Sequence, residues 1–359
     1  MHRRQFLQGL SAAGVLCSLG LAGCALPAAS RHRYLIGGGR RDGGRYVVQA
    51  LNLDGSLRYE LPLPARGHGI ATHPSRPLAV CHARRPGSYL ALFHHQQGNL
   101  LQVREADPDR HYYGHGVFST DGKLLYTTEG VRSTSEGIIG VYALHHEQLT
   151  KVNEFSGFGL GPHEICRLPD GNLVVGVGGV HTQGRTPLNL DTMHPSLCYL
   201  HATSGHIMEQ RSLVDKHLSI RHLAVTSDGE VFTGQQYRGN PDAFPPLIVR
   251  HRRGQALQPL GGSSLDWARF NHYIASIAVT DDYIAATSPP GNCYGLWQRH
   301  SGELIQVAPL PDASGAAARQ GEIWLGSGQG GICQLDHQGR ERRFYSPWQW
   351  DNHWSLIGE

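Results

Sequence analysis

Histidine recurs at one position of an internal repeat, and this recurrence is the strongest chemical signal in the sequence. Each copy has about five residues of β-type sequence, a turn marked by Asp, Gly or Pro, and a second β-type run; His111–Gly130 is the clearest copy. Histidine stands where the first run begins in most copies, as His68, His115, His163, His222 and His353. Side chains so far apart in sequence can act together only if the fold brings the starts of the repeats together.

If the repeats do meet, these histidines form a candidate metal site. Imidazole and carboxylate groups bind Fe, Cu, Zn or Mn, and three or four of them from different repeats suffice for a centre. The predicted metal ligands are His68, His115, His163, Glu164, His222 and His353. Ser276 and Ser314 occupy the equivalent position in two other copies, which argues against a full ring of ligands. Alternatively, the imidazoles cap strand ends or hydrogen-bond one another around water.

A second set of polar residues favours an anionic ligand or partner. Most of them follow the second β-type run of a repeat, where the loops should converge with the histidines. Arginine binds carboxylates bidentately, and a long loop on a rigid scaffold often carries function; the longest such loop is Gly178–Pro195. The predicted ligand-binding residues are Arg84, Arg85, His181, Arg185, Arg221 and Gln236. The alternative is that the arginines are ordinary solvated loop residues.

A third hypothesis is a metal-assisted hydrolase or lyase. Either Glu164 or Glu129 would act as the general base beside a histidine-bound metal. The alternative for both carboxylates is a bond to loop amides or to a neighbouring arginine. The sequence has no GxSxG motif, phosphate loop, dinucleotide fingerprint or CxxCH haem-attachment motif, so it names no reaction.

The repeats predict an all-β, seven-bladed β-propeller. A second series of hairpins follows the first, and the two together make six four-stranded units. Tyr34–Gly39 and Tyr46–Leu63 supply three further strands, while Asn352–Gly358 supplies a single one. Joining these pieces closes a seventh blade with N- and C-terminal strands. With 46 Gly, 20 Pro and no linker-like interruption, residues 34–359 are expected to form one domain.

The N-terminus predicts export. Arg3 and Arg4 precede a mildly apolar stretch, and Leu21-Ala22-Gly23-Cys24 resembles a lipobox. Residues 1–23 are therefore interpreted as a Tat-like lipoprotein signal peptide, Cys24 as the lipidated residue and 24–33 as a linker. The mature protein would be periplasmic and attached to the membrane by its lipid. Without residues 1–23, 30 of the 32 basic residues remain against 29 acidic ones, which disfavours nucleic-acid binding.

Two groups of residues are expected to lie outside any site. Five cysteines remain beyond Cys24, in apolar runs and without a CxxC pair, so they are interpreted as buried small hydrophobic residues. Histidines at the hairpins of the second series, such as His95 and His251, are expected to be exposed to solvent.

Several motifs resemble an uncharacterised bacterial family catalogued as domain of unknown function 1513. They are GHGVFSTDGKLLYTTE, GPHEICRLPDGNLVVGVGG, GRTPLNLDTMHPSLCYL, SIRHLAV and the terminal WDNHW, and they span nearly the whole mature chain. The LNLDTM loop is the most specific of them. The resemblance implies an exported propeller, encoded beside imelysin-like proteins and a di-haem oxidase in apparent iron-uptake clusters. It therefore implies periplasmic metal-uptake proteins as partners, but no established activity.

Overall fold

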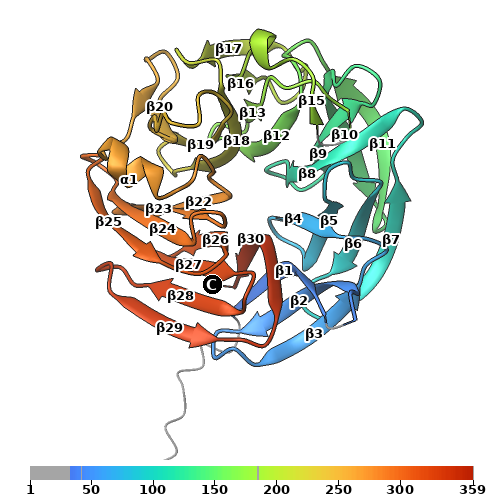
Figure 1. Ribbon diagram of the computed structural model, residues 1–359. Coiled ribbons are helices and arrows are strands. Elements are labelled where there is room, and N and C mark those ends of the chain that lie inside the picture. The colour runs from blue at the N-terminus through green and yellow to red at the C-terminus, as the bar shows by residue number, and fades with distance from the viewer. Residues whose placement is uncertain (1–32, 42, 184–185, 359) are drawn as a thin grey trace, which may run out of the picture.

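The protein is a closed ring of seven four-stranded antiparallel sheets around a central channel (Figure 1). The computed structural model describes residues 33–41, 43–183 and 186–358. Within each sheet the strands follow one another outward from the channel, as in a propeller blade. The predicted seven-bladed β-propeller is therefore confirmed.

The first three blades lie between Gly67 and Ser212. Blade 1 contains β4 (Gly67–Thr72), β5 (Leu78–Ala83), β6 (Tyr89–His94) and β7 (Asn99–Glu105). Blade 2 contains β8 (Arg110–Phe118), β9 (Leu124–Val131), β10 (Gly137–His145) and β11 (Gln148–Phe155). Blade 3 contains β12 (Pro162–Arg167), β13 (Leu173–Val177), β16 (Ser196–Leu200) and β17 (Ile207–Ser212). Its long loop holds β14 (Thr182–Gln183), β15 (Thr186–Pro187) and the 3-10 helix η2 (Leu190–Thr192).

The next three blades continue around the ring in chain order. Blade 4 contains β18 (Leu218–Val225), β19 (Val231–Tyr237), β20 (Ile248–His251) and β21 (Gln258–Pro259). The short helix α1 (Ser264–Ala268) leads into blade 5, and its N-terminus is closed by a capping box of Ser263 and Asp266. Blade 5 contains β22 (Ser276–Val279), β23 (Tyr283–Ser288), β24 (Cys293–Gln298) and β25 (Leu304–Pro309). Blade 6 contains β26 (Ala313–Arg319), β27 (Glu322–Ser327), β28 (Gly331–Leu335) and β29 (Glu341–Tyr345).

The seventh blade joins the two ends of the described chain. Its inner strand is β30 (Gln349–Ile357), and its other strands are β1 (Tyr34–Arg40), β2 (Tyr46–Asn52) and β3 (Leu57–Pro62). β30 pairs antiparallel with β1, and it also contacts the inner strands β26 and β4 of the blades on either side. The ring is thus closed by hydrogen bonds between strands from opposite ends of the chain, as predicted.

The fraction of buried residues in a strand falls from the inside of each blade toward its outer edge. In blade 1, every residue of β5 is buried, whereas most of β7 is exposed. The side chains of the inner and middle strands form the core, which lies between adjacent blades. The cysteines behave as expected: Cys81, Cys198, Cys293 and Cys333 are buried, and Cys166 is half-buried; none forms a disulfide.

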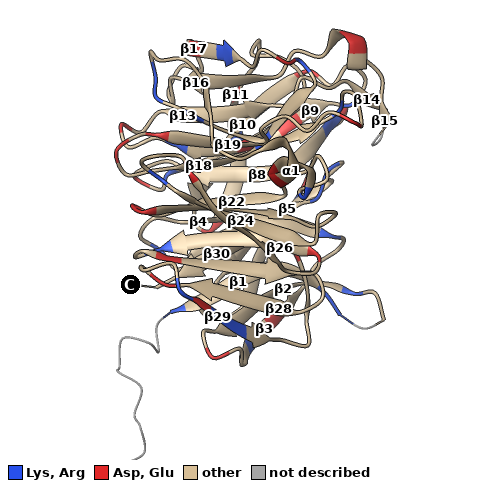
Figure 2. Cartoon of the chain, turned by 60° about the vertical axis from the view of Figure 1, so that its left-hand side comes forward, with Lys and Arg blue, Asp and Glu red and all other residues tan. Residues whose placement is uncertain are grey.

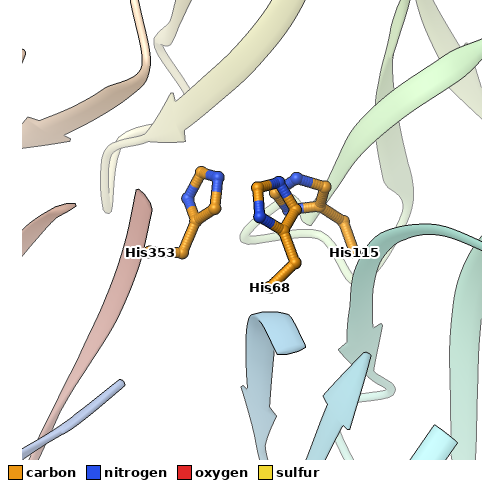
Figure 3. A group of neighbouring side chains, drawn as sticks. All are labelled: His68, His115 and His353. Atoms are coloured by element: carbon orange, nitrogen blue, oxygen red, sulfur yellow. The ribbon is translucent and has the colours of Figure 1, made fainter. Parts of the chain in front are cut away.

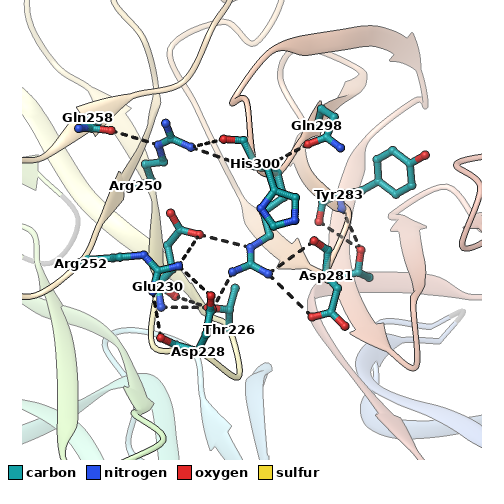
Figure 4. A network of polar contacts seen from close by, with 12 residues as sticks. Thr226, Asp228, Glu230, Arg250, Arg252, Gln258, Asp281, Tyr283, Gln298 and His300 are labelled. Carbon is teal, nitrogen blue, oxygen red and sulfur yellow. Dashed lines mark hydrogen bonds and ion pairs between the residues drawn. The ribbon is translucent and has the colours of Figure 1, made fainter.

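Polar contacts also tie blades together near the rim. Arg299 of blade 5 donates hydrogen bonds to Asp228 at 2.6 Å and to Glu230 at 3.3 Å, both in the β18–β19 turn of blade 4 (Figure 4). Arg252 adds a second bond to Asp228 at 2.8 Å. Elsewhere, charged residues lie mostly on loops and outer strands (Figure 2). No helix in the described part of the chain has both the length and the apolar character needed to cross a membrane.

The expectation that the hairpin histidines are exposed is wrong for two of them. His95 is 6% exposed and His251 is 1% exposed. The Nδ1 atom of each ring lies 2.6 Å from a tyrosine hydroxyl, of Tyr34 and Tyr199 respectively. These hairpins pack beneath a tyrosine from an adjacent strand or blade, so their histidines are buried structural partners.

Candidate metal centre in the channel

Five histidine rings from five consecutive blades converge in the central channel. His68 lies on β4, His115 on β8, His163 on β12, His222 on β18 and His353 on β30. Neighbouring ring centroids are 4.5–4.9 Å apart, including 4.5 Å from His68 to His353 and 4.5 Å from His115 to His353. Figure 3 shows three of these rings pointing toward one another from separate strands. The structure thus brings together all five histidines predicted as metal ligands.

Breaks in strand register direct these side chains into the channel. In β4, β8, β12 and β30 the pairing with the next strand shifts across the segment that contains the histidine, so the histidine has no opposite partner. In β18 the shift leaves out Arg221 instead, next to His222. Such bulges bend a strand and re-aim its side chains, and they are common beside active sites.

The remaining inner strands complete the channel wall with serines. Ser276 of β22 and Ser314 of β26 are each 3% exposed. Hydroxyl groups are poorer ligands than imidazoles for transition metals. The histidines therefore form an arc over five blades, and the partial ring expected from the sequence is the arrangement found.

The histidine layer is buried, yet several of its nitrogens have no partner. His68, His115, His222 and His353 are 1–8% exposed. Three buried ring nitrogens make no hydrogen bond to any described residue: Nε2 of His115, Nδ1 of His163 and Nε2 of His353. Buried polar atoms in folded proteins nearly always have a partner, so such a cluster needs an explanation.

Burial also keeps the rings uncharged. It holds the pKa values of His115, His163 and His353 well below the usual range, and the neighbouring histidines lower them further. Burial likewise lowers the pKa of His68, against the opposing effect of Asp351. At neutral pH these imidazoles therefore keep free lone pairs, which is the form that binds a metal.

Two carboxylates orient the rings. The Oε2 atom of Glu164 accepts a hydrogen bond from the Leu223 backbone N–H at 2.9 Å and lies 3.3 Å from His222 Nδ1. Its Oε1 atom lies 3.8 Å from His115 Nδ1. Asp351 lies 3.4 Å from His68 Nδ1 and accepts a hydrogen bond from Arg66. Burial alone would raise the pKa of Asp351, but the interactions with His68 and Arg66 outweigh this effect and lower it. Carboxylates in such positions fix the orientation of metal-binding imidazoles.

Donor atoms within this layer lie close enough to share one cation. Three sets each have all their ligand atoms within 4.8 Å of one another: His68 with His115 and His353, His115 with His163 and His222, and Glu164 with His222 and His353. All six predicted ligands belong to at least one set. Glu164, proposed as a metal ligand or a general base, therefore lies within the layer itself.

The histidine layer separates two small cavities in the channel. One, of about 140 Å³, is lined by His68, His163 and His222 together with residues of the loops above them. The other, of about 100 Å³, is lined by His115, His353 and the residues that follow the histidines along the inner strands.

The first cavity is rich in arginine, and we call it the arginine pocket. Its lining includes Arg84, Arg85, Arg221 and Gln236, as predicted from sequence, together with Arg238, Tyr273 and Asn352. No Asp or Glu lines it among the described residues. Arg221 is 2% exposed; burial, with the charges of Arg85 and Arg238, lowers its pKa to about 9.

Two predicted site residues lie elsewhere. Glu129, predicted as a candidate general base beside the metal, lies within the sheet of blade 2 because β9 continues beyond it. It pairs with β10 and accepts hydrogen bonds from Tyr142 at 2.6 Å and Lys151 at 3.0 Å. His181 does not line the arginine pocket; its Nδ1 lies 3.0 Å from the Ser135 hydroxyl. Arg185, Cys24 and the proposed signal peptide 1–23 lie outside the described residues.

Sequence reasoning missed four contributors to this region, Tyr273 and three close neighbours of predicted residues. Asp351 and Asn352 precede His353 directly in the WDNHW motif, and Arg238 follows Gln236 by two residues at the end of β19. A systematic reading of the neighbours of each predicted residue would have included all three. Their roles could not be separated because adjacent residues of an irregular strand point in different directions.

The sequence profile of one protein family matches residues 61–357, which include the whole histidine layer and the arginine pocket. That family is described as "Protein of unknown function (DUF1513)". The chain belongs to this family. The family resemblance expected from the sequence motifs is thereby confirmed. No curated protein sequence matches the chain.

Two solved structures are similar in fold to this DUF1513 protein. A protein of unknown function from Bacteroides caccae shares 11% identity, with 91% of this chain and 100% of that chain covered and a TM-score of 0.49. BamB from Moraxella catarrhalis shares 12% identity, with 87% and 82% covered and a TM-score of 0.49. The propeller assignment itself rests on the seven sheets of this chain.

The most specific DUF1513 motifs have visible structural roles. In LNLDTM, the Asn189 side chain accepts a hydrogen bond from the His181 backbone at 2.7 Å and donates one to the Gly179 carbonyl at 3.1 Å, which fixes the long loop. In WDNHW, Asp351 contacts His68, and His353 belongs to the histidine layer. The terminal motif therefore serves both ring closure and the candidate metal centre.

Proposed function

We propose that this protein binds a transition-metal ion in its channel and serves as an accessory in periplasmic metal or iron acquisition. The observation that carries the proposal is the cluster of unpartnered, buried imidazole nitrogens within the histidine layer. A cation would supply the partner that these nitrogens lack. The competing arrangement, in which water or the other imidazoles supply the partners, predicts no stoichiometric binding of a metal.

The donor set favours particular metals. Three or more neutral imidazoles with one carboxylate suit Zn²⁺, Cu²⁺ or Fe²⁺ better than Mg²⁺ or Ca²⁺, which prefer oxygen. Mn²⁺ fits less well for the same reason. The carboxylates Glu164 and Asp351 beside the rings supply the oriented surroundings typical of metal-binding histidines.

Titration of the metal-free mature protein with Co²⁺ tests the proposal. We expect one equivalent to bind, with visible absorption bands of a nitrogen-rich site. Three imidazoles with an ordinary pKa near 6.5 would lose about 50-fold in affinity between pH 7.5 and pH 6.0 through protonation. Because the pKa values of His68, His115 and His353 are lowered, protons compete less, and we expect the loss to be only a few-fold. Absence of stoichiometric Co²⁺ at pH 7.5 would refute the metal site.

The cellular part of the proposal rests on the N-terminal sequence. Arg3-Arg4 and Leu21–Cys24 have the pattern of an exported lipoprotein, and a lipid on Cys24 would hold the propeller at a membrane surface where metal is transferred. Cys24→Ser should move the protein from the membrane fraction to the soluble periplasmic fraction. A full-length protein that remains cytoplasmic, or a Cys24→Ser protein that stays on the membrane, would contradict it.

A further inference from the structure

We infer that the arginine pocket is a binding site for a small oxyanion, held by Arg221 and Arg238, with one oxygen facing the histidine layer. The chemistry is that of a carboxylate or a tetrahedral oxyanion. The site is distinct from the donor sets of the metal centre, although it shares His68, His163 and His222 as walls.

The first argument is the state of Arg221. Its guanidinium is buried, and its Nε and Nη2 atoms have no hydrogen-bond acceptor among the described residues. No ion pair to Arg221 is formed within that part of the chain. A buried cation whose N–H groups lack acceptors is costly, because nothing replaces the hydration that it loses on burial. A bound anion would remove this cost.

A second arginine of the pocket, Arg238, is half-buried and also has a nitrogen without an acceptor. Arg238 lines the same cavity, its Nε is buried without an acceptor among the described residues, and burial lowers its pKa. Arg84 and Arg85 add further positive charge to the lining. No described Asp or Glu lines the pocket, so the lining itself carries a net positive charge. Planar guanidinium groups bind carboxylates and other oxyanions through two parallel N–H bonds.

The size and the remaining lining restrict the ligand. About 140 Å³ is well below the roughly 300–1,000 Å³ of pockets for drug-sized molecules, so a small anion fits and a nucleotide or peptide does not. Gln236, Tyr273 and Asn352 add neutral polar groups to the lining. The pocket therefore has positive charge that attracts an anion and neutral polar side chains that orient it.

The pocket also predicts coupling to the metal, an extension that rests on the proposed function. A divalent cation in the histidine layer would face several arginines, and like charges at close range repel. An anion placed between them would attract both sides, and an oxygen directed at the histidine layer would complete the coordination of the metal. The metal and the anion should therefore bind more tightly together than apart.

Calorimetric titration with malonate and with sulfate tests both parts. We expect the metal-free mature protein to bind either dianion, and Arg221→Met and Arg238→Met each to weaken binding at least 10-fold. Arg319→Met, at an exposed arginine at the end of β26, should change nothing. The Co²⁺-loaded protein should bind malonate at least 10-fold more tightly than the metal-free protein, with a change in the Co²⁺ spectrum.

The outcomes separate the two proposals. If the protein binds Co²⁺ but neither dianion, or if Arg221→Met and Arg238→Met bind both dianions as the wild type does, the anion site is refuted. If the protein binds dianions through Arg221 but no Co²⁺, the anion site stands and the metal centre is refuted. Arg221→Met should bind Co²⁺ in dianion-free buffer at least as tightly as the wild type, because a nearby positive charge is removed; this result also shows that the variant is folded.

Discussion

Replacing His115 by alanine should weaken Co²⁺ or Zn²⁺ binding at least 100-fold, which corresponds to about 2.7 kcal/mol. His115 belongs to two of the three donor sets, and its centroid lies within 4.9 Å of those of His68, His163 and His353. Its loss therefore removes a ligand from two possible arrangements of the metal. Equilibrium dialysis with metal analysis gives the affinity, and His222→Ala, also in two sets, should have a similar effect.

The matched control is His145→Ala. His145 ends β10 and is exposed, so its removal should leave the affinity within two-fold of the wild type. Unfolding of the metal-free proteins by urea distinguishes lost ligands from lost structure. Because His115 Nε2 has no partner in the metal-free state, its removal should cost little beyond the small cavity it leaves. Unchanged metal affinity in both His115→Ala and His222→Ala would mean that the histidine layer is not the metal site.

Replacing Trp354 by alanine should lower the free energy of unfolding by about 3–5 kcal/mol, the usual cost of truncating a buried tryptophan. Trp354 lies on the closing strand β30 and is 6% exposed. Its indole occupies space left by glycines of two blades: a Cβ atom would come within 2.8 Å of it at Gly37 and Gly315, and within 2.1 Å at Gly326. Denaturant unfolding of the metal-free protein measures the loss.

The control for this prediction is Trp348→Ala, which changes the same residue type just before β30. Trp348 is only half-buried, and Arg41 lies over its ring at 5.7 Å. Its loss should cost clearly less than that of Trp354. Gly326→Ala is the complementary change, because the added methyl group would collide with the Trp354 indole. If Trp354→Ala were no more destabilising than Trp348→Ala, the closing strand would not be the anchor of the ring that its packing indicates.

The architecture follows from local sequence properties. Alternation of apolar residues, Gly- and Asp-containing turns and the spacing of repeats depend on residues close in the chain, so they predict the strands and their number. The incomplete pieces at both ends predict closure, and β30 pairs with β1 as expected. The histidines could be predicted to meet for the same reason, since equivalent residues of successive blades face a common axis.

The direction of individual side chains was decided only by the tertiary structure. Glu129 stands at the predicted end of a β-type run, yet the ladder continues to Val131 and places its carboxylate inside the blade beside Tyr142. His95 and His251 lie at hairpins, yet neighbouring tyrosines cover them. Local sequence gives no information on what packs over a residue, so burial of this kind cannot be derived from it.

For this protein, the amino-acid sequence determined the seven-bladed ring, its closure and the set of histidines that face the channel. Only the tertiary structure decided which nitrogens lack partners, how Asp351 and Glu164 orient the rings, and that Arg221 and the Nε atom of Arg238 lie buried without acceptors among the described residues. The physical reason is the bulges in the inner strands. Strand propensity is a local property, whereas the one or two extra residues of a bulge arise from packing between blades and change the direction in which the side chains within it point.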